Sequence, residues 1–475
     1  MPEKQTLVMK FGGTSVGSTK ALVKVIQIVN DAHAEYPRVV VITSAMSGVT
    51  NLLLDSASLA AQGKIDSLAS AESTLREKNF AVADLLIKDE KLCEVTKREI
   101  NDLIFSLVDL CKAIAVLGEA SPRAMDAVAS LGERMSVRLL GAALESAGIN
   151  VNTIESTEFI VTNAHFQNAH PDFKATTEKV RGILNPLLDE GIIPVTTGFI
   201  GATPEGVITT LGRGGSDYSA AIIGSVLPAD EVWIWTDVDG IMTTDPRIVP
   251  TAKTLSEITY SEIAELAYYG AKVLHPKTIR PVVDAGIGLR ICNTLNPTHP
   301  GTRLIANAPP DLQARNGQVV KAVTAIRNQR LVTIEGRGML GVPGVAARAF
   351  GAVASTRTSV PLITQASSEQ SICFAVPAES ATSVINALQA VFASEIEEED
   401  IDRVWMTEDV SIITVVGVGM RHTPGVAGQV FTQLGNSKAN VLAIAQGSSE
   451  VSISMVVAAA DTELAVKALH ELIVK

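Results

Sequence analysis

The chain has 475 residues, 47% of them hydrophobic and 4% aromatic, with a formal net charge of −12 at pH 7. This length exceeds a single hydrophobic core, so we expect two to four domains, and the acidic balance argues against nucleic acid because no basic face can displace counterions. The N-terminus has no apolar signal core, and no apolar run approaches the ~18 residues of a membrane span, so we expect a cytoplasmic protein without membrane contact.

The cysteines and histidines show no arrangement typical of a metal site. The four cysteines have no C-x-x-C spacing, and the seven histidines are scattered along the chain. We therefore expect reduced, mostly buried thiols and no metal held by these side chains.

The first predicted strand, residues 7–10, leads into a glycine-rich turn and a helix. The strand ends on Lys10, and the turn contains Gly12, Gly13, Thr14 and Ser15. Glycines let backbone N–H groups point toward an anion, and a helix N-terminus favours negative charge. The stretch predicts a site for the β- and γ-phosphates of a nucleotide, with an ordinary strand-to-helix turn as the alternative.

The chain continues with alternating strands and helices, which predicts a mostly parallel central sheet covered by helices. The second strand, residues 38–43, ends in a small-residue turn that contains Ser44 and Thr50. Two such turns after neighbouring strands fit ligand binding at the carboxyl ends of the strands. Residues 55–118 are predicted to be mostly helical, as an insertion over the sheet edge.

Glu133 lies in a helix predicted from about residue 124 to residue 147. It is off the apolar stripe and has no basic residue three or four positions away. Two interpretations stay open: a solvated surface glutamate, or a carboxylate that receives a substrate ammonium group.

A glycine-rich loop after the next strand carries Arg213 and Asp217. Arg213 offers a bidentate fork for a carboxylate or phosphate. Asp217, in the first turn of the following helix, is either a helix cap or a residue that orients lysines around a transferring phosphoryl group.

Further cations follow a buried strand that begins at Glu231 and ends at Thr236 and Asp237. Arg247 lies in the turn after it, and Lys272 stands beside a glycine. Each cation alone is more often a solvated surface charge. Together they predict a positive cleft in an acidic protein.

These stretches in combination resemble the aspartokinases of the amino-acid kinase (carbamate kinase-like) fold. The resemblance rests on residues 10–15 (KFGGTS), 212–217 (GRGGSD), 235–237 (WTD) with 245–247 (DPR), and 272–276 (KVLHP). It implies phosphorylation of the L-aspartate side chain by ATP with Mg²⁺, giving 4-phospho-L-aspartate, the first step toward lysine, threonine and methionine. Because the acceptor is already an anion, no general base is required.

The resemblance also implies roles for individual residues. Lys10 and Asp217 would serve catalysis, and aspartate would be held by Ser44, Thr50, Glu133 and Arg213. ATP would be held by Lys10, Gly12, Gly13, Thr14, Ser15, Thr236, Asp237, Met242, Arg247 and Lys272. Met242 stands where many members have a tyrosine, so contact with the nucleotide there is in doubt.

The C-terminal part contains an internal repeat, because residues 331–376 align without gaps on residues 412–457. Each copy reads as strand, Pro-Gly turn into helix, strand, turn, strand, which resembles paired ACT domains, ferredoxin-like βαββαβ modules that bind amino acids. A dimerisation module without a ligand is the alternative. We predict a kinase domain, a linker and two ACT domains with the bounds 1–295, 296–320, 321–400 and 401–475.

The effector is predicted from the same resemblance. Lysine-sensitive aspartokinases tend to carry an acidic residue after a Ser-Val pair, whereas Pro361 follows here, and Gln365 and Gln446 resemble threonine-sensitive enzymes. A neutral amide suits a hydroxyl amino acid. We predict threonine as effector and a homodimer or dimer of dimers formed through the ACT domains, with allosteric residues Met339, Ser359, Val360, Gln365 and Gln446.

Other functions stay open beside a feedback-regulated aspartokinase. The chain matches the layout of the kinase half of a bifunctional aspartokinase–homoserine dehydrogenase, and no dehydrogenase is predicted after it. One alternative is another kinase of this fold that acts on a small carboxylate or a nucleoside monophosphate. The other is a non-catalytic amino-acid-binding regulator, against which the motif residues Lys10 and Asp217 argue.

Overall fold

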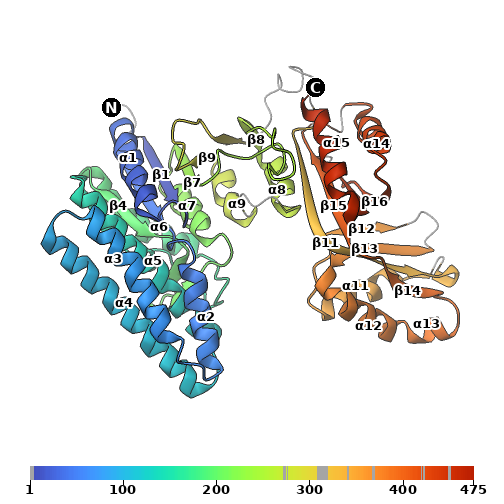
Figure 1. Cartoon of the computed structure of the whole chain (residues 1–475), viewed down its shortest axis with the longest axis horizontal. Coiled ribbons are helices and arrows are strands. Elements are labelled where there is room, and N and C mark those ends of the chain that lie inside the picture. Colours follow the sequence, from blue (N-terminus) through green and yellow to red (C-terminus); the bar gives the residue numbers. More distant parts are fainter. Residues whose placement is uncertain are drawn as a thin grey trace. The chain divides into compact units, whose positions relative to one another are not determined.

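The computed structural model describes residues 5–270, 274, 276–306, 319–339, 342–365, 370–418, 420, 423–447 and 451–474. The chain forms two compact units, and Figure 1 shows their elements coloured along the sequence. Unit 1 comprises Met1–Ile241, Ser256–Ile258 and Leu274–Ala306; unit 2 comprises Met242–Leu255, Thr259–Val273 and Asn307–Lys475. In the described part of the chain, no helix is long and apolar enough to cross a membrane.

Unit 1 is built on an eight-stranded sheet with the order β3-β4-β2-β1-β7-β9-β10-β8. Its strands are β1 (Thr6–Phe11), β2 (Arg38–Thr43), β3 (Val151–Ile154), β4 (Ile193–Thr197), β7 (Glu231–Thr236), β8 (Glu257–Thr259), β9 (Gly288–Asn293) and β10 (Thr302–Ile305). The pairs β3–β4, β4–β2, β2–β1, β1–β7 and β7–β9 are parallel, and β9–β10 is antiparallel. Every residue of β1 is buried, which explains the apolar run at residues 7–9. The predicted mostly parallel sheet is confirmed.

The helices of unit 1 cover this sheet and pack on one another. They are α1 (Thr19–Glu35), α2 (Val49–Ala61), α3 (Leu68–Leu86), α4 (Glu90–Leu117), α5 (Pro122–Ser146), α6 (Phe173–Asp189), α7 (Gly215–Val226) and α9 (Pro276–Asp284). A short hairpin, β5 (Ile200–Ala202) with β6 (Ile208–Thr210), precedes α7. Side chains of α2, α3, α4 and α5 share one apolar core with β1 and β2, which confirms the helical prediction for residues 55–118.

The start of helix α5 is defined by a serine cap followed by a proline. The Ser121 side chain accepts a hydrogen bond from the backbone N–H of Ala124 (3.3 Å), and Pro122 occupies the first helical position. Proline tolerates that position because its missing N–H would have no intrahelical partner. The helix is long, and most of its central residues are buried.

Unit 2 contains a seven-stranded antiparallel sheet with the order β12-β13-β11-β15-β17-β16, and β14 also pairs with β11. The strands are β11 (Ala322–Glu335), β12 (Leu362–Gln365), β13 (Ser371–Pro377), β14 (Arg403–Met406), β15 (Val410–Val416), β16 (Val441–Ala445) and β17 (Ser452–Ala458). The helices are α8 (Tyr260–Tyr268), α11 (Val345–Ser355), α12 (Ala381–Val391), α13 (Ala393–Glu397), α14 (Val426–Asn436) and α15 (Thr462–Val474).

The two copies of the repeat form two modules with separate apolar cores. One core lies under α11 and α12, the other under α14 and α15. Helices α11 and α14 begin after Gly344 and Gly425, whose φ angles of 91° and 88° lie in the left-handed region that favours glycine. The predicted Pro-Gly turns into helices are therefore confirmed at equivalent positions.

Helix α8 packs in unit 2, although it precedes the repeat in the chain. Glu262 in its first turn is fully buried. Its Oε2 lies 2.9 Å from Lys321 Nζ, and its Oε1 accepts a hydrogen bond of 2.7 Å from the backbone N–H of Val418. One carboxylate thus joins α8 to the start of the first module and to the segment after β15.

Candidate active site

A cavity of about 740 Å³ opens in unit 1 beyond the carboxyl ends of β1 and β2. This is where open α/β sheets bind ligands. The lining comes from turns, helix N-termini and one face of α5: Lys10, Gly13, Ser44, Ala45, Met46, Ser47, Gly48, Thr50, Asn51, Leu54, Met125, Asp126, Ala129, Glu133, Gln167, Phe199, Thr210 and residues 212–217.

An ion pair lines the cavity. Lys10 Nζ lies 2.6 Å from Asp217 Oδ1, and the two side chains are 10% and 17% exposed. Lys10 projects from the buried central strand β1, and Asp217 lies in the first turn of α7. The pair is fixed by rigid elements, so its charges are arranged before a substrate enters.

The turns after β1 and β2 lie against each other. An ideal Cβ at Gly13 would be 2.8 Å from the carbonyl oxygen of Ala45, so only glycine fits there without a shift. The backbone N–H of Ser47 donates a hydrogen bond of 3.1 Å to the Gly13 carbonyl. Helix α2 begins after Gly48, whose φ is 81°, and its N-terminus faces the cavity. A helix N-terminus carries partial positive charge, which favours an anion here.

Glu133 points into the cavity and is 3% exposed. Its Oε1 accepts a hydrogen bond of 3.2 Å from the backbone N–H of Ala45, and its Oε2 has no partner among the described residues. Burial raises the pKa of the Glu133 carboxyl to about 8; the hydrogen bond from Ala45 and the charge of Lys10 act against that rise. The alternative of a solvated surface glutamate is therefore wrong.

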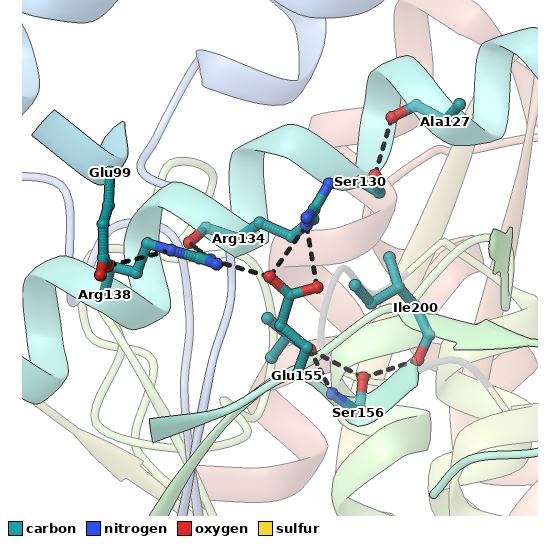
Figure 2. Close-up of polar contacts among 9 residues, drawn as sticks. Glu99, Ala127, Ser130, Arg134, Arg138, Glu155, Ser156 and Ile200 are labelled. Carbon is teal, nitrogen blue, oxygen red and sulfur yellow. Dashed lines mark hydrogen bonds and ion pairs between the residues drawn. The ribbon is translucent and has the colours of Figure 1, made fainter. Parts of the chain in front are cut away.

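Two arginines of α5 are tied to the segment after β3 (Figure 2). Arg134 Nε lies 2.9 Å from both carboxylate oxygens of Glu155, and Arg138 Nη1 lies 2.8 Å from one of them. The next residue, Ser156, donates a hydrogen bond of 2.8 Å from its hydroxyl to the carbonyl of Ile200. These contacts fix the rotation of α5, and thereby the direction in which Glu133 points.

Arg213 lies in the loop between β6 and α7 and lines the cavity. Its side chain is exposed and forms no ion pair within the described ranges. Its guanidinium group is therefore available for a bidentate contact with a carboxylate or phosphate that enters the cavity.

The cavity brings together a group of the residues predicted from the sequence. Those that line it are Lys10, Gly13, Ser44, Thr50, Glu133, Arg213 and Asp217. The other residues of unit 1 predicted to hold ATP, which are not part of this lining, are Gly12, Thr14, Ser15, Thr236 and Asp237.

Several residues predicted to hold ATP have contacts of their own. The Ser15 hydroxyl is buried and lies 2.7 Å from the hydroxyl of Thr294. In unit 2, Arg247 is exposed and lies 2.6 Å from Asp245, while Met242 lies in the same unit. Lys272 lies outside the described residues. The nucleotide roles of all of these residues stay predictions.

The sequence reasoning missed part of the lining. Phe199 lies directly after Gly198, which follows β4, and has a left-handed φ of 67°; a glycine at the end of a strand was the available signal. No sequence motif marked Asp126 and Gln167 as residues of a site, because neither lies in a glycine-rich turn. They meet only through the tertiary fold.

The residues predicted to be allosteric lie in the first and second modules. Gln365 ends β12 and Gln446 follows β16, and both side chains are exposed. Met339 is buried in the apolar core of the first module, Ser359 is exposed and Val360 is half-buried. Their roles in effector binding stay predictions.

Comparison with protein families gives two matches. Residues 5–293 match the amino acid kinase family, and residues 332–392 and 413–472 match the ACT domain. The first match covers strands β1 to β9, and the second covers the two modules of the repeat.

Comparison with individual proteins extends the match over the whole chain. The chain is 34% identical over 469 residues to lysine-sensitive aspartokinase 3 of Escherichia coli (strain K12), covering 98% of each chain. It is 36% identical over 464 residues to bifunctional aspartokinase/homoserine dehydrogenase 2, chloroplastic, of Arabidopsis thaliana, covering 98% of this chain and 50% of that protein. The chain thus spans about half the length of the bifunctional relatives.

A solved structure matches the fold as well. It is E. coli aspartokinase III in complex with aspartate and ADP in its R-state, with a TM-score of 0.79 and 33% identity, covering 99% of this chain and 100% of the other.

Proposed function

Because the chain belongs to the amino acid kinase family, and within it to the aspartokinases, we propose that it transfers the γ-phosphoryl group of ATP to the side-chain carboxylate of L-aspartate. The product is 4-phospho-L-aspartate, an acyl phosphate, in the first step of lysine, threonine and methionine biosynthesis. The observation that carries the proposal is the cavity in which Lys10, Asp217, Glu133 and Arg213 converge.

The charges of the cavity match an amino acid with two carboxylates. Glu133 is buried, its Oε2 has no partner in the described part of the chain, and it suits the substrate ammonium group. Arg213 suits the α-carboxylate through a bidentate contact. This arrangement leaves the side-chain carboxylate of aspartate to approach Lys10, where the phosphoryl group is received.

The main barrier to the reaction is repulsion between two anions. Aspartate is ionised at neutral pH because its side-chain pKa is ~3.9, so no base has to remove a proton. The ammonium of Lys10 and the N-termini of α2 and α7 offset the negative charge of carboxylate and triphosphate. Catalysis then comes from positioning and electrostatics.

Mg²⁺ is expected to accompany ATP. Among the described residues, no three His, Cys, Asp or Glu side chains cluster as metal ligands. This fits Mg²⁺, which in kinases is bound by one or two carboxylates and by substrate phosphates. Asp217 is the carboxylate placed to contribute, and the ion would neutralise charge on the phosphates.

The test is aspartate-dependent formation of ADP with hydroxylamine present. An acyl phosphate reacts with hydroxylamine to give a hydroxamate, so hydroxamate should appear in proportion to ADP. Glutamate, carbamate and UMP serve as alternative acceptors. ADP release with one of these and none with aspartate would refute the proposal in favour of another kinase of the fold.

We further propose that threonine inhibits the enzyme through the ACT modules, with the chain assembled as a dimer through them. Support comes from Pro361, which stands where an acid would receive a lysine ammonium, and from Gln365 and Gln446, exposed at equivalent strand ends. The E. coli relative is lysine-sensitive by name, so lysine is the competing effector. Inhibition requires the effector to bind the inactive arrangement more tightly than the active one.

Titrating threonine and lysine, singly and together, decides between the two effectors. Gln365→Ala and Gln446→Ala should each relieve threonine inhibition and leave uninhibited turnover unchanged, because neither residue lies in the kinase cavity. Inhibition by lysine with indifference to threonine would overturn the assignment.

A further inference from the structure

Asp126 is a buried carboxylate in the cavity that no motif indicated. It lies on α5, seven residues and thus about two helical turns before Glu133, and it is 1% exposed. It forms no ion pair in the part of the chain that the structure describes. A buried carboxylate without a counter-charge is costly unless hydrogen bonds satisfy its oxygens.

The hydrogen bonds of Asp126 come from two separate segments. Its Oδ2 accepts from the backbone N–H of Gln167 and of Thr210, both at 2.9 Å. Its Oδ1 accepts from the Thr210 hydroxyl at 2.7 Å and from the Gln167 N–H at 3.1 Å. Burial raises the pKa of the Asp126 carboxyl, and these hydrogen bonds oppose the rise.

The two segments form one wall of the cavity. Thr210 ends β6, and Arg213 follows three residues later in the same loop. Gln167 has a left-handed φ of 67°, a conformation that is strained for a non-glycine residue, and its N–H is bound to the Asp126 carboxylate in that conformation.

The segments also contact each other directly. The backbone N–H of Ala169 donates to the carbonyl of Thr210 at 2.9 Å. A Cβ on Gly212 would lie 2.9 Å from Asn168 Oδ1 and 3.0 Å from the carbonyl oxygen of Gln167. The Arg213 loop therefore rests on the segment around Gln167, and Asp126 anchors both.

We propose that Asp126 is a positioning residue that places the Arg213 guanidinium group for the α-carboxylate of the substrate. A carboxylate offers about four lone-pair sites, and the four contacts above, two of them shared by the single N–H of Gln167, are directed at them. Asp126 thus has no free acceptor for a substrate ammonium group, unlike Glu133. The inference rests on the proposed aspartate kinase activity.

Two substitutions of similar size distinguish the loss of the Asp126 hydrogen bonds from a change in side-chain volume. In Asp126→Asn, the amide oxygen can take the place of Oδ2 and accept from Gln167 and Thr210, while the amide nitrogen donates to the Thr210 hydroxyl. This variant loses only the longest of the four hydrogen bonds. Asp126→Leu removes every acceptor and leaves the backbone N–H groups of Gln167 and Thr210 without it, of which that of Thr210 is buried.

We expect the KM for aspartate to change more than the KM for ATP. Asp126→Leu should raise the KM for aspartate ~10- to 100-fold, the range of a lost charge-assisted contact, and the KM for ATP less than ~3-fold. Asp126→Asn should stay within ~3-fold of wild type for both substrates. Ser130→Ala is the matched control, because Ser130 is buried on the same helix and, among the residues that the structure describes, its hydroxyl donates to the carbonyl of Ala127 alone.

A double variant tests whether Asp126 acts through Arg213. If it does, Asp126→Leu should add little to the KM for aspartate once Arg213 is alanine, whereas independent effects would multiply. Multiplying effects, an unchanged KM for aspartate in Asp126→Leu, or equal rises for aspartate and ATP would each overturn the proposal.

The proposal stays testable if Asp126→Leu does not fold. Thr210→Val removes one of the four hydrogen bonds and should raise the KM for aspartate ~3- to 10-fold without affecting that for ATP. An unchanged KM for aspartate in folded Thr210→Val would then overturn the inference. Wild-type chain that forms no hydroxamate with aspartate would instead refute the proposed function.

Discussion

Replacing Glu133 with glutamine tests the buried carboxyl group that the proposed mechanism needs in its charged form. Glutamine keeps the size of the side chain and an oxygen to accept from Ala45, but it cannot ionise. Burial raises the pKa of Glu133 to about 8, against a usual value of 4.5. The substitution should therefore change stability and substrate binding in opposite directions.

The pH dependence of the free energy of unfolding follows from the difference in the Glu133 pKa between the folded and the unfolded chain. Between pH 4.5 and about 8 the folded chain keeps the Glu133 proton, while the unfolded chain has lost it. The free energy of unfolding therefore falls as pH rises through this window, and the contribution present below pH 4.5 is lost by about pH 8. Glu133→Gln lacks this slope, so the variant should melt at a higher temperature than wild type at pH 8 and at nearly the same temperature at pH 4.5.

Binding of aspartate should change in the other direction. Removing one partner of a buried ammonium–carboxylate pair costs ~2–5 kcal/mol, or at least ~30-fold in affinity. At pH 7 wild-type Glu133 must first release its proton, which costs ~1.4 kcal/mol and reduces its advantage about tenfold. Half of the Glu133 carboxyl groups are still protonated at pH 8, so the ratio of the variant's KM for aspartate to that of wild type should rise about fivefold from pH 7 to pH 8.

The assay is hydroxamate formation across pH 6–8.5, with thermal melts of both proteins in the same buffers. Glu145→Gln is the control, since Glu145 is an exposed glutamate on the same helix. A KM ratio that does not vary with pH, together with a variant less stable than wild type at pH 8, would show that Glu133 is ionised in the free protein and would refute the reasoning.

Four further substitutions test other contacts. Lys10→Ala and Asp217→Ala should each lower kcat ~10²- to 10³-fold in a coupled ADP assay, because each removes a preorganised charge. Near-normal turnover in either folded variant would remove that residue from the mechanism. Arg213→Ala should raise the KM for aspartate ~10- to 100-fold and that for ATP far less, and the reverse pattern would mean that the two substrates are exchanged. Glu262→Ala should lower the free energy of unfolding by ~3–5 kcal/mol, because Lys321 loses its buried partner. Urea titration measures this change. An unchanged free energy of unfolding would show that the ion pair contributes no net stability.

The sequence by itself determined the elements and the architecture. Uninterrupted apolar runs such as residues 39–42 mark strands buried on both faces, and Gly344 and Gly425 mark helix starts that need a left-handed residue. These signals are local, because periodicity and turn chemistry depend on neighbouring residues. The gap-free repeat likewise showed two modules before any contact was known. The motif residues that the cavity gathers, including Lys10 and Arg213, could be found in the same way.

The tertiary structure alone decided which polar groups are buried and what they meet. Periodicity left Glu133 open between solvent and cavity, and packing of α5 against the turns after β1 and β2 buried it. Asp126 meets Thr210 across 84 positions of sequence, and Glu262 meets Val418 across 156. No local pattern encodes such pairs, because their burial and their hydrogen bonds exist only once distant elements have packed together.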